Sequence, residues 1–566
     1  MSRKILVVGG VAGGASAAAR LRRISEEDEI IVFEKGPNVS FSNCCLPYHL
    51  GGVIKNADDL VLMTPELFRD QYNLDVRANN EVIAIDREAK EVIVKILPSG
   101  KEYRESYDKL ILSPGGKPIV PPIPGIEKAR TFTIRNVVDI KKLGKAIKEK
   151  DVKNISVIGG GFIGVETVEN LKEAGYNVTL VEAMPQILRI MDYDMVQILH
   201  KEIYDQGVEL IIDDKVTAFE EKAIVLDSGR KVEADLVILA IGVSPETDLA
   251  KQANLELGKT GAMKVDQNYR TIDRDIYAVG DAIEVYSYLF SDYFKLPLAG
   301  PAQKQARGVA DHINNKSIDN RGYIGTSILK VFDYNAASTG LTEGFINDAK
   351  LKLDYNHVRI IPGDKVGLMP SSMSMHFKLI YEVPTGKILG AQAIGKGNVD
   401  KRIDVIATVI KFGGTIRDLK DLELCYAPPF GTAKDVVNFA GYVAVNLLND
   451  DFRQVPVTQV RELVEKKAPI FDVREKNEYE QSHLKGAINI PLSELRKRMD
   501  EFPKDQPIYL HCRSGQRSYN AVLALQNSGF TNVFNISGGF MGISFYEYFN
   551  DKNTDREPIL TDYNFD

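Results

Sequence analysis

This chain of 566 residues has few cysteines, no large excess of positive or negative charge, and no long apolar runs. Its four cysteines, Cys44, Cys45, Cys425 and Cys512, are too few and too scattered to cross-link secreted domains, so we predict a reducing, cytoplasmic location. The 78 acidic and 71 basic residues are mixed along the chain and give a net charge of -7, which leaves no basic face for nucleic acid. No uncharged stretch reaches the roughly 20 apolar residues that span a bilayer, so we expect no membrane partner.

The first residues imitate a secretory signal peptide, because Arg3 and Lys4 precede an uncharged stretch that ends in small residues. Four glycines interrupt this stretch, and the same pattern returns near residue 155, where no signal peptide can lie. We therefore interpret both segments as parts of folded domains. The composition, 44% hydrophobic and 26% charged, is typical of a globular chain, and the length predicts roughly three to four domains.

A unit of strand, glycine turn, helix and strand occurs twice, once from Lys4 to Glu34 and again from Asn154 to Glu182. In each unit an apolar run leads through the glycines into a helix, where backbone N–H groups and the helix dipole can face a pyrophosphate. Each unit also ends in a glutamate that can bind a ribose hydroxyl. The repeat predicts two related nucleotide-binding modules.

The two glycine turns differ in how closely they follow the G-x-G-x-x-G spacing. Gly159, Gly161 and Gly164 satisfy it in full, whereas in the first turn Val11 occupies the middle position. One such turn without a nucleotide is common, but two with correctly placed acids favour nucleotide binding. Because Glu182 would repel a 2′-phosphate and no arginine immediately follows it, we expect NADH to be preferred, with NADPH still possible.

Three further stretches complete the organisation of the chain. Residues 81–97 alternate apolar and polar residues like antiparallel strands, and residues 323–447 change to an α+β pattern. A short polar stretch then precedes a last segment that alternates strands and helices.

Cys44 lies in the segment Ser40-Phe-Ser-Asn-Cys-Cys-Leu-Pro-Tyr48, directly after the first module. The segment is predicted to open a helix, with Pro47 acceptable in the first turn. A thiol at a helix N-terminus is expected to have a lowered pKa and to act as a nucleophile. Taken alone, however, a cysteine is more often a small buried apolar residue.

With this segment in place, residues 1 to about 447 resemble the flavin- and nicotinamide-dependent disulfide reductases, and among them the coenzyme A disulfide reductases, which share S-F-x-N-C-x-L-P-Y. A second FAD motif of that family matches Thr271 to Asp281. The resemblance implies that electrons pass from NADH to FAD and then to Cys44. Since no second cysteine follows four residues later, Cys44 should form a mixed disulfide with its substrate.

The resemblance also implies sets of binding residues, with no metal site among them. For FAD these are Gly9, Val11, Ala12, Gly13, Glu34, Lys35, Val82, Ser113, Pro114, Gly115, Gly280, Asp281, Leu298 and Ala299. For the nicotinamide nucleotide they are Gly159, Gly161, Phe162, Ile163, Gly164, Glu182 and Gly242. For coenzyme A, as substrate or bound ligand, they are Ser16, Arg20, Arg23, Ser40, Asn43 and Lys434.

The family works as a homodimer in which tyrosines of the partner subunit bind the sulfur being reduced, and Tyr426 matches one of them. The second is missing, because the corresponding segment reads Ile360-Ile-Pro-Gly-Asp364. This loss should weaken reduction of a disulfide more than that of a persulfide, whose leaving group departs readily. Cys45 replaces the usual glycine; a vicinal disulfide would be strained, so we interpret Cys45 as a bystander. We interpret Cys425 as structural.

Residues 456 to about 550 resemble a rhodanese domain, with motifs at 470–475 and 483–491 and the loop Cys512-Arg-Ser-Gly-Gln-Arg-Ser518. A strand that ends at a cysteine and a glycine loop forms a nest of N–H donors around the sulfur. The predicted catalytic set is Cys512, Arg513, Ser514, Gly515, Gln516 and Arg517. Arg513 and Arg517 should favour the thiolate, while Asp472 and His483 are predicted to be structural. A phosphatase and an inactive binding module are the alternatives; related phosphatases carry one more residue before the arginine.

The sequence thus predicts an α/β protein with two Rossmann-like modules, an α+β dimerisation domain and a C-terminal α/β rhodanese domain. The predicted boundaries are 1–118 with 248–322 for FAD, 119–247 for NAD(H), 323–447 for dimerisation, 448–455 for a linker, 456–552 for the rhodanese domain and 553–566 for a tail. The predicted function is NADH-dependent reduction of coenzyme A persulfide or related small persulfides, with sulfur transfer at Cys512. The alternatives are a coenzyme A disulfide reductase with an accessory sulfurtransferase, an NADH oxidase or peroxidase that cycles a sulfenic acid, and a redox sensor without turnover.

Overall fold

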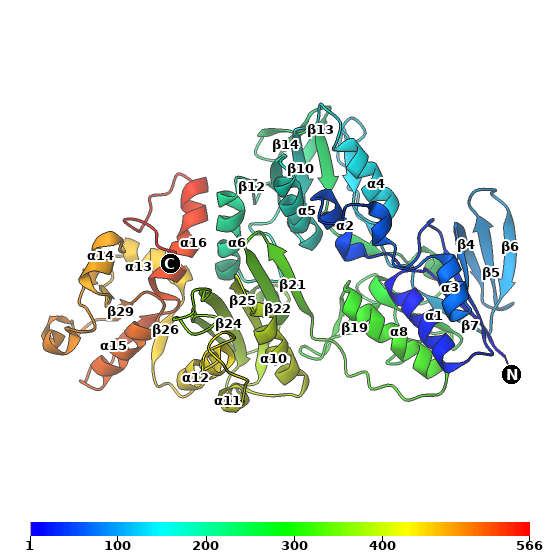
Figure 1. Ribbon diagram of the computed structural model, residues 1–566. Helices are drawn as coiled ribbons and strands as arrows, with labels where there is room; N and C mark the ends of the chain where they lie inside the picture. The colour runs from blue at the N-terminus through cyan, green and yellow to red at the C-terminus, as the bar shows by residue number, and fades with distance from the viewer. Residues whose placement is uncertain (1, 566) are drawn as a thin grey trace. The chain divides into compact units, whose positions relative to one another are not determined.

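The computed structural model describes residues 2–565. The chain forms two compact units, one from residues 1–184 and 211–323 and the other from residues 185–210 and 324–566 (Figure 1).

The first module of the first unit is a five-stranded parallel sheet in the order β18-β7-β1-β2-β3. Its strands are β1 (Lys4–Val8), β2 (Glu29–Glu34), β3 (Asp75–Ala78), β7 (Lys109–Leu112) and β18 (Ile276–Ala278). Helices α1 (Ala12–Ile24) and α8 (Ala299–Ile313) pack on each other beside it. The apolar β1 is buried along most of its length, as expected for the centre of a parallel sheet.

The second module repeats this plan with the strand order β12-β11-β10-β16-β9. Its elements are β9 (Thr131–Thr133), β10 (Asn154–Ile158), α5 (Phe162–Glu173), β11 (Asn177–Val181), β12 (Glu209–Ile211) and β16 (Leu236–Leu239). β10 pairs in parallel with both β11 and β16. The predicted pair of Rossmann-like modules is therefore confirmed.

Two three-stranded antiparallel sheets accompany these modules, and one of them includes the stretch that the alternation of residues 81–97 predicted. It contains β4 (Asn80–Asp86), β5 (Glu91–Ile96) and β6 (Glu102–Ser106) (Figure 1). The other contains β13 (Val216–Glu220), β14 (Ala223–Leu226) and β15 (Lys231–Glu233).

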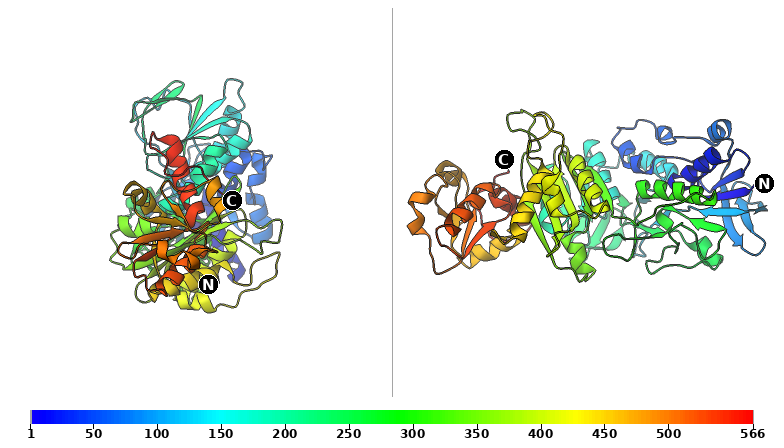
Figure 2. Two further views of the ribbon diagram at one scale, coloured as in Figure 1. Left: turned by 90° about the vertical axis from the view of Figure 1, so that its left-hand side faces the viewer. Right: turned by 90° about the horizontal axis from the view of Figure 1, so that it is seen from below.

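The second unit contains an antiparallel sheet in the order β21-β22-β25-β24-β23. Its strands are β21 (Thr326–Val331), β22 (Tyr334–Gly340), β23 (Tyr355–Ile360), β24 (Met375–Glu382) and β25 (Ile388–Gly395). Helix α10 (Val399–Lys411) packs on β22 and β25, and α12 (Val436–Leu448) packs on β23 and β24 (Figure 2). This arrangement is the predicted α+β domain.

The same unit ends in a parallel sheet in the order β26-β30-β29-β27-β28. Its elements are β26 (Arg453–Val455), α13 (Val460–Glu465), β27 (Ile470–Asp472), α14 (Lys476–Gln481), β28 (Ile488–Asn489), β29 (Ile508–His511), α15 (Gln516–Gln526), β30 (Val533–Ile536) and α16 (Gly539–Asn553). β26 lies within the predicted linker, yet it pairs in parallel with β30 and so belongs to this sheet. Its side chains gave no strand signal because an edge strand of three residues is too short to show alternation.

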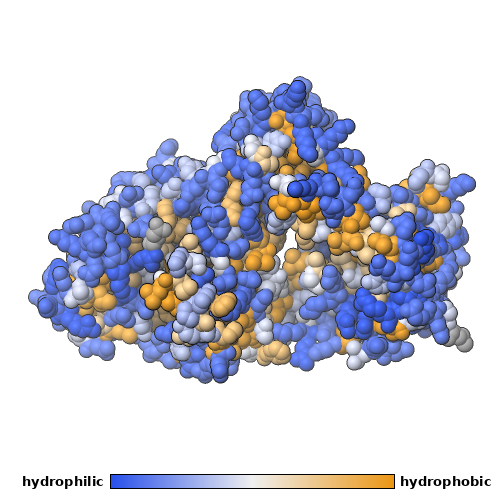
Figure 3. All heavy atoms as spheres, in the orientation of Figure 1, coloured by the Kyte–Doolittle hydropathy of each residue, from blue (hydrophilic) through white to orange (hydrophobic). Residues whose placement is uncertain are grey.

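Hydrophilic residues cover most of the face in Figure 3, and apolar residues form separate groups on it. Between residues 2 and 565, no helix is both long enough and apolar enough to cross a membrane.

Candidate functional site

The two glycine turns have the same local geometry. Gly9 and Gly159 adopt φ values of +95° and +107°, in the region that glycine enters at little cost. A Cβ at Gly14 would lie 1.8 Å from the carbonyl oxygen of Gly9, and one at Gly164 would lie 1.9 Å from that of Gly159. Each helix therefore starts so close to its strand that only glycine fits.

The glutamates at the strand ends are also equivalent. Glu34 accepts hydrogen bonds from the N–H groups of Gly10 (2.9 Å) and Gly36 (2.7 Å). Glu182 accepts them from Gly160 (2.7 Å) and Met184 (2.8 Å). Both carboxylates are thus fixed beside a glycine turn and keep further lone pairs for ribose hydroxyls.

A cavity of about 750 Å³ opens at the carboxyl ends of the first sheet. This is where parallel sheets bind their ligands. The predicted FAD residues that line it are Gly9, Val11, Ala12, Gly13, Glu34, Lys35, Val82, Ser113, Pro114, Gly115, Gly280 and Asp281. Leu298 and Ala299 lie at the start of α8, and the cavity is lined instead by Ala302, one turn further along.

Other residues of this cavity escaped the sequence analysis, because they come from segments without a glycine motif. They include Phe41, Asn80, Glu81, Ile83, Arg135, Asn136, Val138, Asp139, Leu249 and Gln252. The Arg135 guanidinium lies next to Gly115, where a Cβ would come within 2.5 Å of Nη2. Burial raises the pKa of Asp281, and Arg135 partly opposes that shift.

The second glycine turn is open to a ligand. A Cβ at Gly161 would meet no atom within 4 Å, so the backbone there can approach a phosphate closely. Phe162 and Ile163 begin α5, whose N-terminus points its free N–H groups at this space. Gly242, with a φ of +119°, follows β16.

Cys44 lies in a 3₁₀ turn, Asn43–Cys45, which is followed by the short helix α2 (Leu46–Leu50). The residue is exposed, and neither Cys44 nor Cys45 is in a disulfide. The expected lowering of its pKa is wrong: packing around the sulfur raises the pKa by desolvation, and the Glu166 carboxylate raises it further. The turn is too short to supply the dipole of a full helix.

The position of Cys44 in the chain ties it to the cavity, since its neighbour Asn43 is one of the lining residues. Asn43 was predicted to contact coenzyme A. Its Oδ1 atom is buried without a hydrogen-bond partner in the protein, so it is free to receive one from a ligand.

The other predicted coenzyme A residues are dispersed. Arg20 forms an ion pair with Asp311 of α8 at 2.6 Å, whereas Arg23 is exposed. Ser16 is half-buried on α1. Ser40 is held by a hydrogen bond from its N–H to the Gly10 carbonyl.

Two predicted residues belong to the second unit. Tyr426 is exposed beside the exposed Cys425. Lys434 is also exposed and places its ammonium group 5.5 Å from the Tyr442 ring.

The sulfur of Cys512 lies in a cradle at the end of β29, with the residue only 1% exposed. The N–H of Gly515 donates to Sγ at 3.2 Å, and the Ser518 hydroxyl lies 3.6 Å from it. Gly515 has a φ of +106° and begins α15, an arrangement that turns N–H groups toward an anion. Ser514 is half-buried in this loop, and Arg513 and Gln516 are exposed.

Part of the positive charge expected at this loop is compensated. Arg517 donates two hydrogen bonds to Glu478, at 2.6 and 2.7 Å. Arg474 and Asp472 form a buried ion pair at 2.6 Å, which fits the structural role predicted for Asp472. His483 stacks on Tyr479 at the end of α14.

Comparison with known proteins covers all of these regions. The family model of the pyridine nucleotide-disulphide oxidoreductases matches residues 3–306. The family model of their dimerisation domain matches residues 326–436, and that of the rhodanese-like domain matches residues 456–545.

The relatives include one curated protein and two solved structures. The coenzyme A disulfide reductase of Staphylococcus aureus strain JH9 is 36% identical over 443 residues, which cover 78% of this chain and 99% of that protein. The reduced Bacillus anthracis CoADR-RHD has a TM-score of 0.94 and 46% identity, covering 96% of this chain and 98% of that one. The NAD-dependent persulfide reductase of A. fulgidus has a TM-score of 0.90 and 34% identity, covering 96% and 100%. This chain is a member of the pyridine nucleotide-disulphide oxidoreductase family that carries a rhodanese-like domain at its C-terminal end.

Proposed function

We propose that this enzyme uses NADH to reduce coenzyme A persulfide, or a related small persulfide or polysulfide, to the thiol and H2S. The net reaction is RSSH + NADH + H⁺ giving RSH + H2S + NAD⁺. The observation that carries the proposal is one exposed cysteine, Cys44, beside the cavity, on the same chain as a sulfur cradle at Cys512. The printed activities of the relatives, disulfide and persulfide reduction, point the same way.

The large cavity fits FAD. Its walls include a glycine turn at the N-terminus of α1 and the fixed carboxylate of Glu34, which together suit a pyrophosphate and a ribose. Gly280, which has a φ of +81°, and the neighbouring Asp281 also line the cavity. When bound there, FAD would carry the two electrons from NADH to sulfur.

The second glycine turn would hold NADH. Its backbone at Gly161 is open, and the Glu182 carboxylate is fixed where it can accept a ribose hydroxyl. The same carboxylate would repel a 2′-phosphate, so we expect NADH to react better than NADPH.

The chain's own part in the chemistry begins with loss of the Cys44 proton. The thiolate attacks one sulfur of the substrate, and the S–S bond breaks with its electron pair on the other sulfur. Attack on the inner sulfur gives a mixed disulfide and releases HS⁻; attack on the outer sulfur gives a protein persulfide and releases the thiol. Two electrons, supplied by NADH through the flavin, and two protons then break the new S–S bond. This releases the thiol from the mixed disulfide, or H2S from the protein persulfide, and returns Cys44 to its thiol.

Coenzyme A would bind near the start of the chain, with the exposed Arg23 for its phosphate and Asn43 near its sulfur. We propose that the chain is a homodimer, consistent with its dimerisation domain. In that assembly the partner would present Tyr426 and Lys434, both of which are exposed here.

Cys512 would take a sulfane sulfur from a donor and pass it to a thiol such as coenzyme A, which would make the persulfide for Cys44. Its cradle of N–H groups favours an anionic sulfur. A reducing compartment suits two working thiols.

Two other functions differ from this one in outcomes that can be measured. A coenzyme A disulfide reductase with an accessory sulfurtransferase would reduce the disulfide well, and Cys512→Ser would leave that rate unchanged. An NADH oxidase or peroxidase would consume oxygen or peroxide without any thiol substrate.

The decisive experiment measures H2S release from coenzyme A persulfide with NADH, for the unmodified enzyme, Cys44→Ser and Cys512→Ser. We expect near-complete loss for Cys44→Ser. Cys512→Ser should lose H2S release only with those sulfane donors whose sulfur must first be transferred by the rhodanese domain. Full sulfide production by Cys44→Ser, or faster turnover of coenzyme A disulfide than of the persulfide, would reject the proposal.

A further inference from the structure

Arg359 lies in strand β23 of the dimerisation domain, yet its side chain packs against the rhodanese-like domain of the same unit. The side chain is only 1% exposed, and its Nη1 atom pairs with Asp194 at 3.3 Å. The Nε and Nη2 atoms are buried and have no hydrogen-bond partner within residues 2–565. Burying a guanidinium that is only partly paired costs free energy, so stability alone does not account for an arginine here.

The Arg359 side chain packs against two glycines at the start of α16. A Cβ at Gly538 would lie 3.5 Å from both Cδ and Nε of the arginine, and one at Gly542 would lie 3.7 Å from Cζ. The Arg359 carbonyl also accepts a hydrogen bond from the Ser537 hydroxyl at 3.4 Å. The side chain and the backbone of this one residue therefore both hold residues 537–542.

The same segment binds the backbone of the sulfur loop. The N–H groups of Phe540 and of the residue after it donate to the carbonyls of Cys512 and Arg513, at 2.7 and 3.0 Å. A Cβ at Gly515, whose N–H donates to the Cys512 sulfur, would lie 3.8 Å from the backbone nitrogen of Gly538. Residues 538–542 thus lie between the arginine and the loop that surrounds the sulfur.

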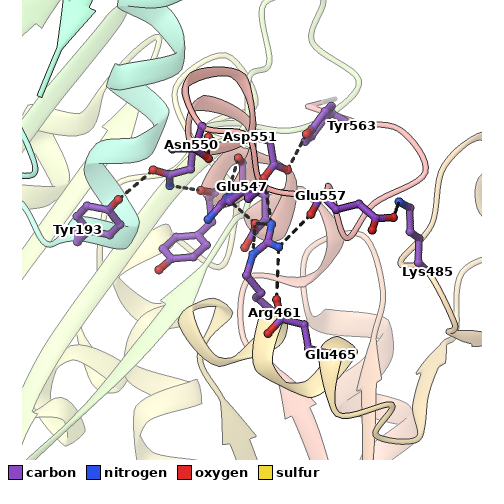
Figure 4. Close-up of polar contacts among 12 residues, drawn as sticks. Tyr193, Arg461, Glu465, Lys485, Glu547, Asn550, Asp551, Glu557 and Tyr563 are labelled. Carbon is purple, nitrogen blue, oxygen red and sulfur yellow. Dashed lines mark hydrogen bonds and ion pairs between the residues drawn. The ribbon is translucent and has the colours of Figure 1, made fainter.

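The rest of α16 is fixed by other contacts, which Figure 4 shows. Glu547 and Asp551 both pair with Arg461 of α13. The Tyr193 hydroxyl of helix α6 (Tyr193–Asp205) donates to Asn550 at 3.1 Å. Because these contacts hold the C-terminal half of the helix, loss of the arginine should disturb mainly the first turn, where the sulfur loop is bound.

We propose that Arg359 is a positioning residue for sulfur transfer at Cys512, so that the dimerisation domain completes the transfer site. The arginine holds residues 538–542, and these hold the loop whose N–H groups surround the sulfur. Since this role involves no contact with the sulfur donor, loss of the arginine should lower kcat more than it changes KM. The inference rests on the proposed role of Cys512 in sulfur transfer, but not on the flavin chemistry.

The transfer itself balances without a redox partner. The Cys512 thiolate attacks the outer sulfur of thiosulfate, and the donor S–S bond breaks with its electron pair on the departing sulfite. The product is a persulfide anion on Cys512. Cyanide then attacks the sulfane sulfur, leaves as thiocyanate and restores the thiolate.

The test measures kcat and KM for thiocyanate formation from thiosulfate and cyanide, with the full-length enzyme and no NADH. Arg359→Met removes the guanidinium, while Asp194 keeps its pairing with Lys378 at 2.8 Å. We expect kcat to fall by about tenfold, with little change in the KM for thiosulfate. Arg359→Lys keeps an aliphatic stem over Gly538 and a cation for Asp194, so its kcat should fall only a few-fold.

Arg402→Met is the matched control, because Arg402 is an equally buried arginine of the same domain. Its side chain is 1% exposed, pairs with Asp435 at 3.0 Å and donates to the carbonyl of Asp364. Neither of these partners belongs to the rhodanese-like domain. The stability of this variant should fall as it does in Arg359→Met, whereas kcat for sulfur transfer should be unchanged.

Equal kcat values in the unmodified enzyme and Arg359→Met would overturn the proposal, and so would equal losses in Arg359→Met and Arg402→Met. If Arg359→Met does not fold, Arg359→Lys decides, and an unchanged kcat in that variant overturns the proposal. Cys512→Ser separates the two levels of the argument. Transfer that survives Cys512→Ser refutes the proposed role of Cys512, whereas its loss there combined with a full rate in Arg359→Met refutes the positioning role alone.

Discussion

Arg517 and Glu478 face each other with two parallel hydrogen bonds of 2.6 and 2.7 Å, which join the sulfur loop to helix α14. The pair lowers the pKa of Glu478, first through the hydrogen bond from Arg517. The arginine is thereby fixed close to Cys512, with much of its charge compensated. It orients the loop more than it adds positive charge.

Glu478→Gln removes the carboxylate that holds Arg517 beside the sulfur loop. A neutral amide holds a guanidinium less firmly, so we expect kcat/KM for sulfur transfer from thiosulfate to fall by about tenfold. Glu480→Gln, an exposed acid on the same helix, should leave kcat/KM unchanged. An unchanged value in Glu478→Gln would contradict the role given to this pair.

Replacing Glu182 should change the choice of nucleotide. Glu182→Ala removes the acceptor for the ribose hydroxyl and the repulsion of a 2′-phosphate, so the NADH to NADPH ratio of kcat/KM should fall by about tenfold. The comparison variant is Glu221→Gln, which lies at an exposed turn of the same module. An unchanged ratio would mean that discrimination lies elsewhere.

Glu166 should control the reactivity of Cys44. Burial raises the pKa of Glu166 to about 7, so above that pH its negative charge opposes the Cys44 thiolate. Glu166→Gln removes this opposition, and the midpoint of Cys44 alkylation by iodoacetamide should move to lower pH.

That measurement needs a background of Cys45→Ser and Cys425→Ser, so that one accessible thiol is followed. Glu127→Gln, an exposed acid of the same unit, serves as the control. An unchanged midpoint would show that Glu166 does not contribute to the raised pKa of Cys44.

The sequence predicted the features that depend on residues close together in the chain. Gly9 and Gly159 are recognisable because a positive φ followed by a helix leaves few alternatives to glycine. The loop at Cys512 is recognisable for the same reason, since its strand, glycine and helix are consecutive. The antiparallel pairing of β4 with β5 followed from alternation alone.

The remaining features depend on contacts between distant segments. Arg135 and Gln252 reach the large cavity from parts of the chain more than 100 residues away from its glycine turn. The partner of Arg517 lies 39 residues before it. Residues 559–565 lie in the predicted tail, yet the Tyr563 hydroxyl donates to Asp551 of α16 (Figure 4) and the His483 N–H donates to Thr561. The sequence could not show these contacts, because they exist only in the folded domain. The pKa of Cys44 depends likewise on Glu166, which comes from the second nucleotide module.

A buried group of charges around Lys378 should contribute strongly to the stability of the second unit. The Lys378 ammonium lies between Asp192 at 3.1 Å and Asp194 at 2.8 Å, and it also pairs with Glu343. These three carboxylates could bind a metal ion by their spacing, but the lysine occupies the space between them. Its charge is what allows them to be buried.

Lys378→Met removes the cation that these carboxylates share and leaves Asp194 with Arg359 at 3.3 Å. The free energy of unfolding should then fall by about 3–5 kcal/mol. The urea midpoint of the second unit measures this loss, with Lys396→Met, an exposed pair with Asp333, expected to cost at most about 1 kcal/mol. In the unmodified chain the pKa of Glu343 is lowered from 4.5 to about 2, chiefly through His357 and Lys378 acting against burial. Since a lowered carboxyl pKa stabilises the fold above the unfolded value, this contribution should be full above pH 4.5 and disappear as the pH falls toward 2. A Lys378→Met chain with the same urea midpoint would show that the carboxylates are protonated rather than paired.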